Sequence, residues 1–318
     1  MSILGTIKKL IALKDLMLLV KFKFGVEDKT NMKVCISCKK DFERNNWICP
    51  ACGYEPQSNN GFLFFSNDSS QANEGFASGY FENLASLEAS NFWFCSRNKL
   101  IVWTLGKYFP HATDFFEVGC GTGFVLSGIE KAFPDLDLYG SEIFKEGLEF
   151  AKKRTKAKFF QMDARLIPFK EEFDVMGAFD VLEHIKEDEE VLEQMYKAIK
   201  PGGGLILTVP QHKFLWSKVD EVSFHKRRYG INELKTKIEN AGFKVLTSTS
   251  FVAFLLPFIT LSRMRLKLLN GKFDLYSEFK LNTILNTVFE VILNLETILI
   301  KIGMRFPFGS SLLIVATK

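Results

Sequence analysis

The sequence predicts an α/β fold with a mostly parallel sheet and helices on both of its faces. From about Asn91, apolar strand-like segments alternate with amphipathic segments of helical period, and this alternation is typical of βαβ units. Glycine-rich turns and acidic residues follow several of the apolar segments, where the strands of such a sheet would end. The length of 318 residues allows about two folding units of about 150 residues each.

The composition excludes three classes of protein but does not indicate what the protein binds. Hydrophobic residues make up 47% of the chain, which contains 33 phenylalanines and only six cysteines. Such a chain is neither disordered, nor collagen-like, nor a disulfide-stabilised miniprotein. The net charge of +4 is compatible with a nucleic-acid partner or a membrane partner and requires neither.

Residues 1–30 are predicted to form a basic amphipathic helix. Apolar residues recur at helical spacing with lysines between them, and the longest apolar run is Leu16–Val20. This run is too short for a signal peptide, which needs about 7–15 apolar residues. Two placements stay open: an anionic membrane surface or the protein's own core. We therefore expect a cytoplasmic protein with reduced thiols, peripheral on the inner face of the membrane in the first case.

Residues 31–58 are predicted to form a zinc ribbon. The pairs Cys35/Cys38 and Cys49/Cys52 are two CxxC turns separated by ten residues, and each turn brings two thiolates to one side. Four thiolates complete the tetrahedral shell of a structural zinc ion, whose binding would supply the folding energy of so short a module. The cytosolic setting disfavours a disulfide pair, and the doubled motif disfavours a redox site.

Residues 59–90 are predicted to be a linker, because Ser, Asn, Gly and Gln dominate up to about residue 79. Residues 91–318 are predicted to form the main domain, with an apolar helical insertion at 251–308 before the last strand. The predicted strands of this domain are Asp114–Val118, Leu136–Ser141, Lys158–Gln161, Phe173–Phe179, Gly204–Val209, Phe243–Thr249 and Leu312–Thr317.

A glycine-rich loop follows the first of these strands. Gly119, Gly121 and Gly123 allow a sharp turn and a close approach of a ligand to the backbone. A dinucleotide fingerprint would require one more glycine where Phe124 stands. A diphosphate ligand is therefore disfavoured.

Carboxylates stand at the ends of the next predicted strands. Glu142, nineteen residues after Gly123, is placed to accept hydrogen bonds from both hydroxyls of a ribose. Asp163 ends the third strand, where it would accept from an adenine amino group, and Asp180 ends the fourth. Ligands of open α/β sheets bind at the carboxyl ends of the strands, so we expect these residues to share one site.

In this order, the glycine loop, the acids and the motif Asp-Val-Leu-Glu-His at 180–184 resemble the class I S-adenosylmethionine-dependent methyltransferases. The last motif is similar to the signature of ubiquinone-biosynthesis O-methyltransferases, and the resemblance covers about residues 91–250 and the last strand. It implies a Rossmann-like, doubly wound, seven-stranded sheet and S-adenosylmethionine as cofactor. Glu142 replaces the family's more frequent aspartate but keeps the carboxylate. The cofactor-binding residues that the resemblance implies are Glu117, Gly119, Cys120, Gly121, Gly123, Glu142, Ile143, Asp163, Ala164 and Asp180.

Histidines are the candidates for proton transfer. A sulfonium methyl group is already electrophilic, so a methyltransferase mainly aligns the acceptor and excludes water. A general base is required only if the acceptor must lose a proton. His225 is the first candidate and His184 the second. Glu183 and His184 could instead cap the helix after the fourth strand.

A basic cluster after the fifth strand is predicted to bind the acceptor. Arg227, Arg228 and Tyr229 would grip a phosphate or carboxylate, because arginine offers two parallel donors. The alternative is a solvated basic loop that is fixed by an Arg–Asp pair. Arg97, in an aromatic segment before the first strand, is predicted to reach a carboxylate of the cofactor or of the acceptor.

The insertion at 251–308 is predicted to wall the acceptor pocket, either as a helical lid or as a membrane-facing element. Residues 281–302 form an apolar helix with one polar stripe. The helix reaches the about 20 residues that span a bilayer, but Glu290, Glu296 and Lys301 argue against spanning. Basic residues after the first apolar run favour an anionic interface. The polar stripe comprises Asn282, Asn286, Glu290, Asn294, Thr297 and Lys301.

These features predict a methyltransferase that transfers the methyl group in line to an apolar or lipid-linked small molecule, with an oxygen as the expected acceptor atom. The first alternative is an RNA methyltransferase that grips RNA with its zinc ribbon. The predicted ribbon contains acidic as well as basic residues, so nucleic acid is disfavoured as a partner. The second alternative, a non-catalytic cofactor-binding scaffold, is disfavoured by the intact glycine loop and acids.

Overall fold

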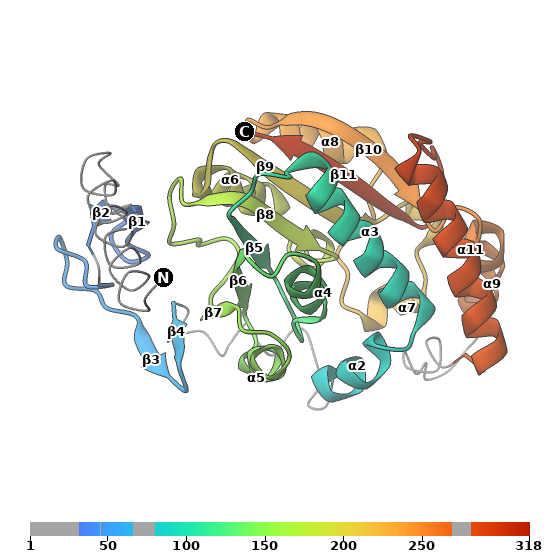
Figure 1. Ribbon diagram of the computed structural model, residues 1–318, viewed down its shortest axis with the longest axis horizontal. Coiled ribbons are helices and arrows are strands. Elements are labelled where there is room, and N and C mark those ends of the chain that lie inside the picture. Colours follow the sequence, from blue (N-terminus) through green and yellow to red (C-terminus); the bar gives the residue numbers. More distant parts are fainter. Residues whose placement is uncertain (1–31, 45, 66–79, 269–280) are drawn as a thin grey trace, which may run out of the picture.

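The computed structural model describes residues 32–44, 46–65, 80–268 and 281–318. The predicted N-terminal helix at 1–30 lies outside them. The described chain builds around a nine-stranded sheet of order β10-β11-β9-β8-β5-β6-β7-β4-β3, and β1 and β2 form a separate two-stranded sheet (Figure 1).

The middle of the large sheet is parallel, from β9 through β8, β5 and β6 to β7. Near-continuous apolar runs suit these strands because both of their faces are buried. β11 and β10 extend the sheet from β9 with antiparallel pairing. All seven predicted strands are confirmed, and with them the α/β fold. They are β5 (Asp114–Val118), β6 (Asp137–Glu142), β7 (Lys158–Gln161), β8 (Phe173–Phe179), β9 (Ile199–Pro210), β10 (Lys244–Phe251) and β11 (Ser311–Thr317).

The sheet has two more strands than predicted. β3 (Gln57–Asn59) and β4 (Phe62–Phe64) form a hairpin, and β4 pairs parallel with β7. Asn60 and Gly61 make the turn with φ of 52° and 82°, and Asn-Gly is the preferred dipeptide of two-residue hairpin turns. The segment 59–90 is therefore not a plain linker. Its strands escaped prediction because they are short and β3 is exposed throughout, so no apolar alternation marks it.

Helices cover both faces of the sheet. Successive strand residues point to opposite faces: Phe115 joins the core cluster under α3, α4 and α11, and Phe116 joins the cluster under α6 and α8. The helices of this domain are α2 (Tyr80–Glu88), α3 (Phe92–Tyr108), α4 (Phe124–Ala132), α5 (Lys145–Arg154), α6 (Asp188–Ala198), α7 (Lys218–Val222), α8 (Ile231–Asn240), α9 (Leu256–Leu268) and α11 (Thr283–Lys301).

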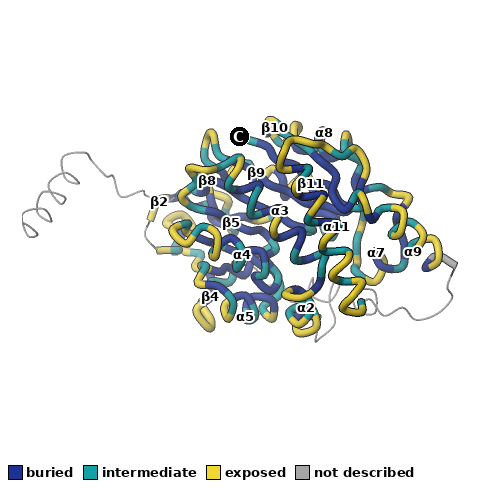
Figure 2. Tube along the Cα trace, turned by 45° about the vertical axis from the view of Figure 1, so that its right-hand side comes forward, coloured by how far each residue is buried: buried dark blue, intermediate teal, exposed yellow. Residues whose placement is uncertain are grey.

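The predicted helical insertion consists of α9 and α11, between β10 and β11. The two helices lie side by side, with the rings of Phe258 and Phe289 6.5 Å apart. They occupy the end of the molecule opposite to β1–β4 (Figures 1 and 2). The sheet therefore separates the cysteine-rich module from the insertion.

The cysteine-rich module packs against the loop that follows β7. Its strands β1 (Met32–Val34) and β2 (Asp41–Glu43) pair antiparallel. The Trp47 ring packs edge-on against two rings of the core under the large sheet, at 4.7 Å from Phe65 and 5.5 Å from Phe169. Aromatic contacts of this kind contribute about 0.5–1.5 kcal/mol beyond the buried area.

Glu172, just before β8, makes the stability depend on pH. Burial raises the pKa of Glu172 to about 7, against the opposing charge of Lys33 in β1. A carboxyl group whose pKa is raised on folding contributes stability below the pKa of the unfolded chain, near 4.5. That stability is lost as the pH rises through about 7.

We expect the free energy of unfolding of Glu172→Gln to exceed that of the parent by about 2 kcal/mol at pH 8, because the variant has no buried carboxyl group to ionise. Urea unfolding at pH 5 and pH 8 measures the difference. Glu171→Gln, at the exposed neighbouring residue, is the matched control and should leave the pH dependence unchanged. An unaltered pH dependence in Glu172→Gln would contradict the assignment.

Candidate active site

A cavity of about 990 Å³ lies at the carboxyl ends of the parallel strands, where ligands bind in open α/β sheets. Small-molecule sites typically measure about 300–1,000 Å³, so this cavity has room for a cofactor and an acceptor together. The glycine loop and strand-end acids wall one part, and histidines and the helical insertion wall another.

The glycine loop after β5 turns sharply. Gly119, Gly121 and Gly123 have φ of 68°, 51° and 75°, a region that side-chain-bearing residues rarely adopt. Gly119, Cys120 and Gly121 line the cavity, whereas Gly123 does not. A Cβ on Gly123 would lie 2.9 Å from the backbone of Ala151. Gly123 therefore lets the loop pack closely on α5 and has no contact with the cavity.

Glu117, at the end of β5, is buried and lines the cavity. Burial raises its pKa well above the usual range, although the charge of Arg97 opposes this. Among the described residues, its Oε2 has no hydrogen-bond partner. Buried polar atoms are normally paired, so this oxygen is suited to receive a donor group from a ligand.

Glu142, at the end of β6, is held in place before any ligand binds. Its carboxylate accepts hydrogen bonds from the amides of Gly121 at 3.0 Å, Ile143 at 2.8 Å and Phe144 at 3.1 Å. Glu142 and Ile143 both line the cavity. The carboxylate thus joins the glycine loop to the start of α5, in the place predicted for ribose binding.

Asp163 and Ala164, beyond the end of β7, line the cavity next to Glu142. The Asp163 carboxylate accepts from Arg165, with Nη2 at 2.6 Å, and Arg165 also pairs with Glu187 at 3.0 Å. The predicted adenine-binding residue is therefore fixed by an arginine that sequence analysis did not identify.

Asp180, at the end of β8, also lines the cavity and has a positive φ of 58°. It forms an ion pair with Arg97 of α3 and accepts from Thr208 Oγ1 at 3.2 Å. The Arg97 guanidinium lies 4.5 Å from the centre of the Trp93 ring, a cation–π contact. The structure thus brings together two predicted site residues, and each balances the charge of the other.

Glu88, Thr122 and Arg154 form a network that sequence analysis missed. Glu88, the last residue of α2, pairs with Arg154 of α5, and Arg154 donates to Thr122 in the glycine loop at 2.7 Å. Glu88 lines the cavity. The network ties the loop to two helices. No local motif marks it, because its members come from three separate segments.

The two candidate bases lie on the acceptor side of the cavity, with ring centres 4.7 Å apart. His225 Nδ1 lies 2.9 Å from Oδ1 of buried Asp220, which also accepts from Arg228 at 2.7 Å. Burial would raise the pKa of Asp220, but His225 and Arg228 hold it at about 2. Burial and the neighbouring His225 lower the pKa of His184 to about 3. With this pKa His184 is a weak base, and of the two histidines it is His225 that has an orienting carboxylate.

Of the predicted acceptor-binding cluster, Arg228 lines the cavity, and Arg227 and Tyr229 do not. Arg227 pairs with Asp188 at 2.8 Å, and the fully buried Tyr229 donates its hydroxyl proton to Asp188 at 2.7 Å. These two residues brace the start of α6. The Arg228–Asp220 ion pair matches the alternative interpretation of a loop fixed by an Arg–Asp pair.

The helical insertion reaches the cavity, as predicted. Phe258, Ile259 and Arg263 of α9 and Phe289 of α11 are among the lining residues. Three of these four side chains are apolar. The insertion therefore supplies apolar side chains and one arginine to the wall of the cavity.

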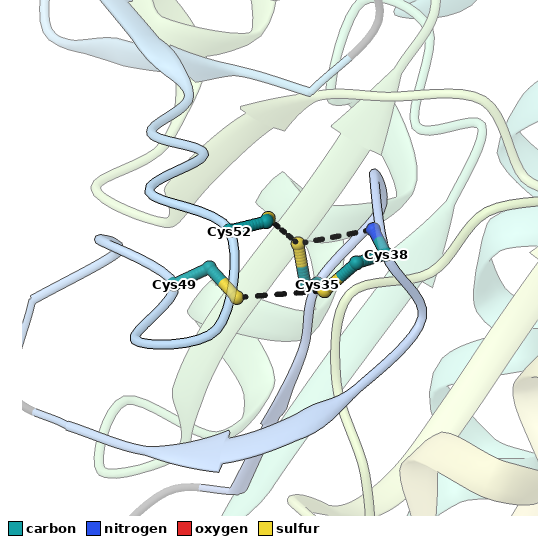
Figure 3. A group of neighbouring side chains, drawn as sticks. All are labelled: Cys35, Cys38, Cys49 and Cys52. Atoms are coloured by element: carbon teal, nitrogen blue, oxygen red, sulfur yellow. Dashed lines mark hydrogen bonds between the residues drawn. The ribbon is translucent and has the colours of Figure 1, made fainter.

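Two groups of described residues could hold a metal ion by the proximity of their ligand atoms. One consists of Glu183, His184 and His225. The other is the cysteine cluster, in which Sγ of Cys35 lies 3.6 Å from that of Cys52, and Sγ of Cys38 lies 3.6 Å from that of Cys49 (Figure 3). Zinc–sulfur bonds of about 2.3 Å in a tetrahedron place the sulfurs about 3.8 Å apart. The thiols therefore fit a structural zinc ion.

Comparison with known proteins agrees with this geometry. Residues 116–207 match the family model described as a methyltransferase domain. The ubiquinone/menaquinone biosynthesis C-methyltransferase UbiE of Desulfotalea psychrophila is 27% identical over 38% of this chain and 51% of that protein. The malonyl-[acyl-carrier protein] O-methyltransferase of Calditerrivibrio nitroreducens is 24% identical over 45% of this chain and 49% of that protein. The chain thus spans about half the length of each relative.

Among solved structures, a chain from the complex between the Haloferax volcanii Trm112 methyltransferase activator and a candidate methyltransferase has the same fold. The TM-score is 0.50 with 15% identity, over 75% of this chain and 97% of that chain. The family match lies on the strands that carry the glycine loop and the acids. The chain therefore has the Rossmann-like fold of the class I S-adenosylmethionine-dependent methyltransferases, and residues 116–207 match the methyltransferase domain.

Proposed function

We propose that the chain transfers a methyl group from S-adenosylmethionine to an apolar or lipid-linked small molecule. The observation that carries this proposal is the composition of the cavity. Its cofactor side presents the glycine loop and acids of the family, and its acceptor side is walled by apolar residues of α9 and α11. By their names, the matched relatives include enzymes that methylate carbon, oxygen and nitrogen, and we favour oxygen because a histidine faces the acceptor side.

His225 is the proposed general base. Bound S-adenosylmethionine supplies a methyl group that needs no further activation. His225 would accept the proton of the acceptor hydroxyl at Nε2 as the hydroxyl oxygen takes the methyl group that the bound cofactor would supply, with the leaving electron pair remaining on the cofactor's sulfur. Asp220 orients the ring through Nδ1, and Arg228 keeps Asp220 ionised.

The cysteine cluster is proposed to hold zinc as a structural ion, because its four thiols leave no open ligand position. The RNA alternative is disfavoured because the module lies at the far end of the sheet from the insertion (Figure 1). An RNA gripped by this module would approach the cavity from the cofactor side.

Transfer of labelled methyl groups tests the function. Purified protein is incubated with labelled S-adenosylmethionine and a total lipid extract, total RNA, or neither. Label in the lipid phase supports the proposal, whereas label in RNA would support the first alternative. Cofactor binding without any transfer would support a scaffold.

We expect His225→Asn to lower the rate of label transfer about a hundredfold, at the low end of the usual contribution of general-base catalysis, with cofactor affinity unchanged. Single-turnover transfer rates and calorimetric titration with the cofactor measure the two effects. His111→Asn, at an exposed histidine outside the cavity, is the matched control. A full rate in His225→Asn would exclude this residue as the base.

A further inference from the structure

The face of α11 that meets the domain is not purely apolar. Beside the buried Leu293 and Ile300 it carries polar residues with partners in the domain: Asn286 accepts from the amide of Phe92 at 2.9 Å, and Glu290 pairs with Lys99 at 2.8 Å. Glu296 is buried and accepts from the amide of Ala253 at 2.8 Å. A helix of a globular protein normally turns its apolar stripe inward.

The outward face of α11 is apolar and continues onto α9. On α11 one row of exposed apolar residues recurs every three or four positions and ends at Ile302, the residue after the helix, and on α9 a second row recurs every three positions. These two rows form the apolar face. Its members, with exposed fractions, are Ile284 (77%), Val288 (46%), Val291 (61%), Leu295 (52%), Ile298 (54%) and Ile302 (75%), and Phe258 (63%), Leu261 (69%) and Met264 (59%).

The same helices border the cavity. Phe258 belongs both to the apolar face and to the cavity lining, and Ile259 and Phe289 line the cavity next to it. An apolar molecule that reaches this face is therefore adjacent to the acceptor side of the site. Contiguous exposed apolar surface on a soluble protein marks an interaction site.

The contacts of α11 with the domain determine whether it would cross a membrane or lie along its surface. The helix has 19 residues and a mean hydropathy of 1.6, so its length and composition alone would allow it to cross a membrane. Asn286 and Glu290 of the stripe, and Glu296 outside it, are bound to the domain, which holds the helix against the protein along its length. It is therefore placed to lie in the plane of a bilayer surface.

A second copy of the chain fits the apolar face less well. Helix pairs usually carry charged residues beside the apolar seam, where they select the partner. Here the residues beside the apolar face of α11 include Leu285, Ile292 and Thr287, which are uncharged. The two acids of α9 and α11 are both engaged with the domain, and α9 carries Arg263 and the exposed Arg265. Such a face complements anionic headgroups.

We propose that the apolar face of α9 and α11 docks in the plane of an anionic lipid bilayer and admits the acceptor from the membrane into the cavity. This inference rests on the proposed function for the nature of the acceptor, but the docking can be measured without it.

The test is flotation of the full chain with vesicles of phosphatidylglycerol and phosphatidylcholine, in the absence of cofactor. We expect the parent to float with these vesicles and less with pure phosphatidylcholine. The double variant Val291→Gln/Ile298→Gln should partition at least tenfold less. Leu246→Gln, at a 46% exposed leucine of β10, is the matched control and should float like the parent.

Two outcomes would overturn the proposal. Unchanged flotation of the double variant would place membrane binding elsewhere in the chain. A parent that sediments as a dimer and a double variant that sediments as a monomer would make a second copy the occupant. Cofactor titration without vesicles reports separately on the proposed function, and we expect it to be the same in all of these variants.

Discussion

Replacing Glu142 by alanine is expected to weaken the binding of S-adenosylmethionine roughly a thousandfold. A hydrogen bond to a charged group is worth about 1.5–3 kcal/mol, and two ribose hydroxyls donate to this carboxylate in the proposed complex. A loss of about 4 kcal/mol corresponds to roughly three orders of magnitude in affinity. The effect should be large because three backbone amides donate hydrogen bonds to the Glu142 carboxylate and hold it in position before the ligand binds.

Calorimetric titration with the cofactor measures this loss. Glu142→Gln keeps an acceptor oxygen for the amides and should fall between the parent and the alanine variant, which separates ligand binding from loss of the loop contact. Glu146→Ala, at an exposed glutamate of α5, is the matched control and should bind like the parent. Parent-like affinity in Glu142→Ala, with an unchanged circular dichroism spectrum, would refute the placement of the ribose.

The strands and the glycine loop could be predicted because their signals are local. A buried parallel strand must be apolar along its whole length, and a sharp turn at a strand end requires glycine. The hairpin that extends the sheet gives a weaker signal. Only Asn60-Gly61 marks it, and β3 has no buried residue.

Side-chain direction could not be predicted in the basic cluster. Arg227 and Arg228 are adjacent and chemically identical, yet Arg228 lines the cavity while Arg227 pairs with Asp188. The choice depends on where α6 and α7 place their carboxylates. The same limit applies to α11. The polar stripe was visible in the sequence, but only the contacts of Asn286 and Glu290 show that it faces the domain.

The cysteine-rich module depends on its metal because it has almost no core. Its buried apolar cluster consists of Cys35, Phe42 and Cys49. Binding of a structural zinc ion contributes about 10–16 kcal/mol in comparable small modules. The module also holds the segment after β7, because Val34 donates to Pro168 and Lys170 donates to Met32, both at 3.1 Å. Asp163 precedes this segment.

We therefore expect Cys49→Ser to abolish zinc binding and to unfold the module. The parent should contain one zinc ion per chain, and the variant none. Limited proteolysis should cut the variant between residues 32 and 64 while the main domain stays intact. Because the segment after Asp163 loses its support, cofactor affinity should fall about tenfold, equivalent to about 1.4 kcal/mol.

Zinc analysis, proteolysis and calorimetric titration of the same preparation measure these three effects. Cys95→Ser, at an isolated half-buried cysteine of α3, is the matched control and should keep both zinc and affinity. A zinc-free parent that resists proteolysis would show that the module folds without metal. The module would position Asp163 through the contacts of Val34 and Lys170 with each other's segments. Loss of zinc with unchanged cofactor affinity would therefore show that the module does not position Asp163.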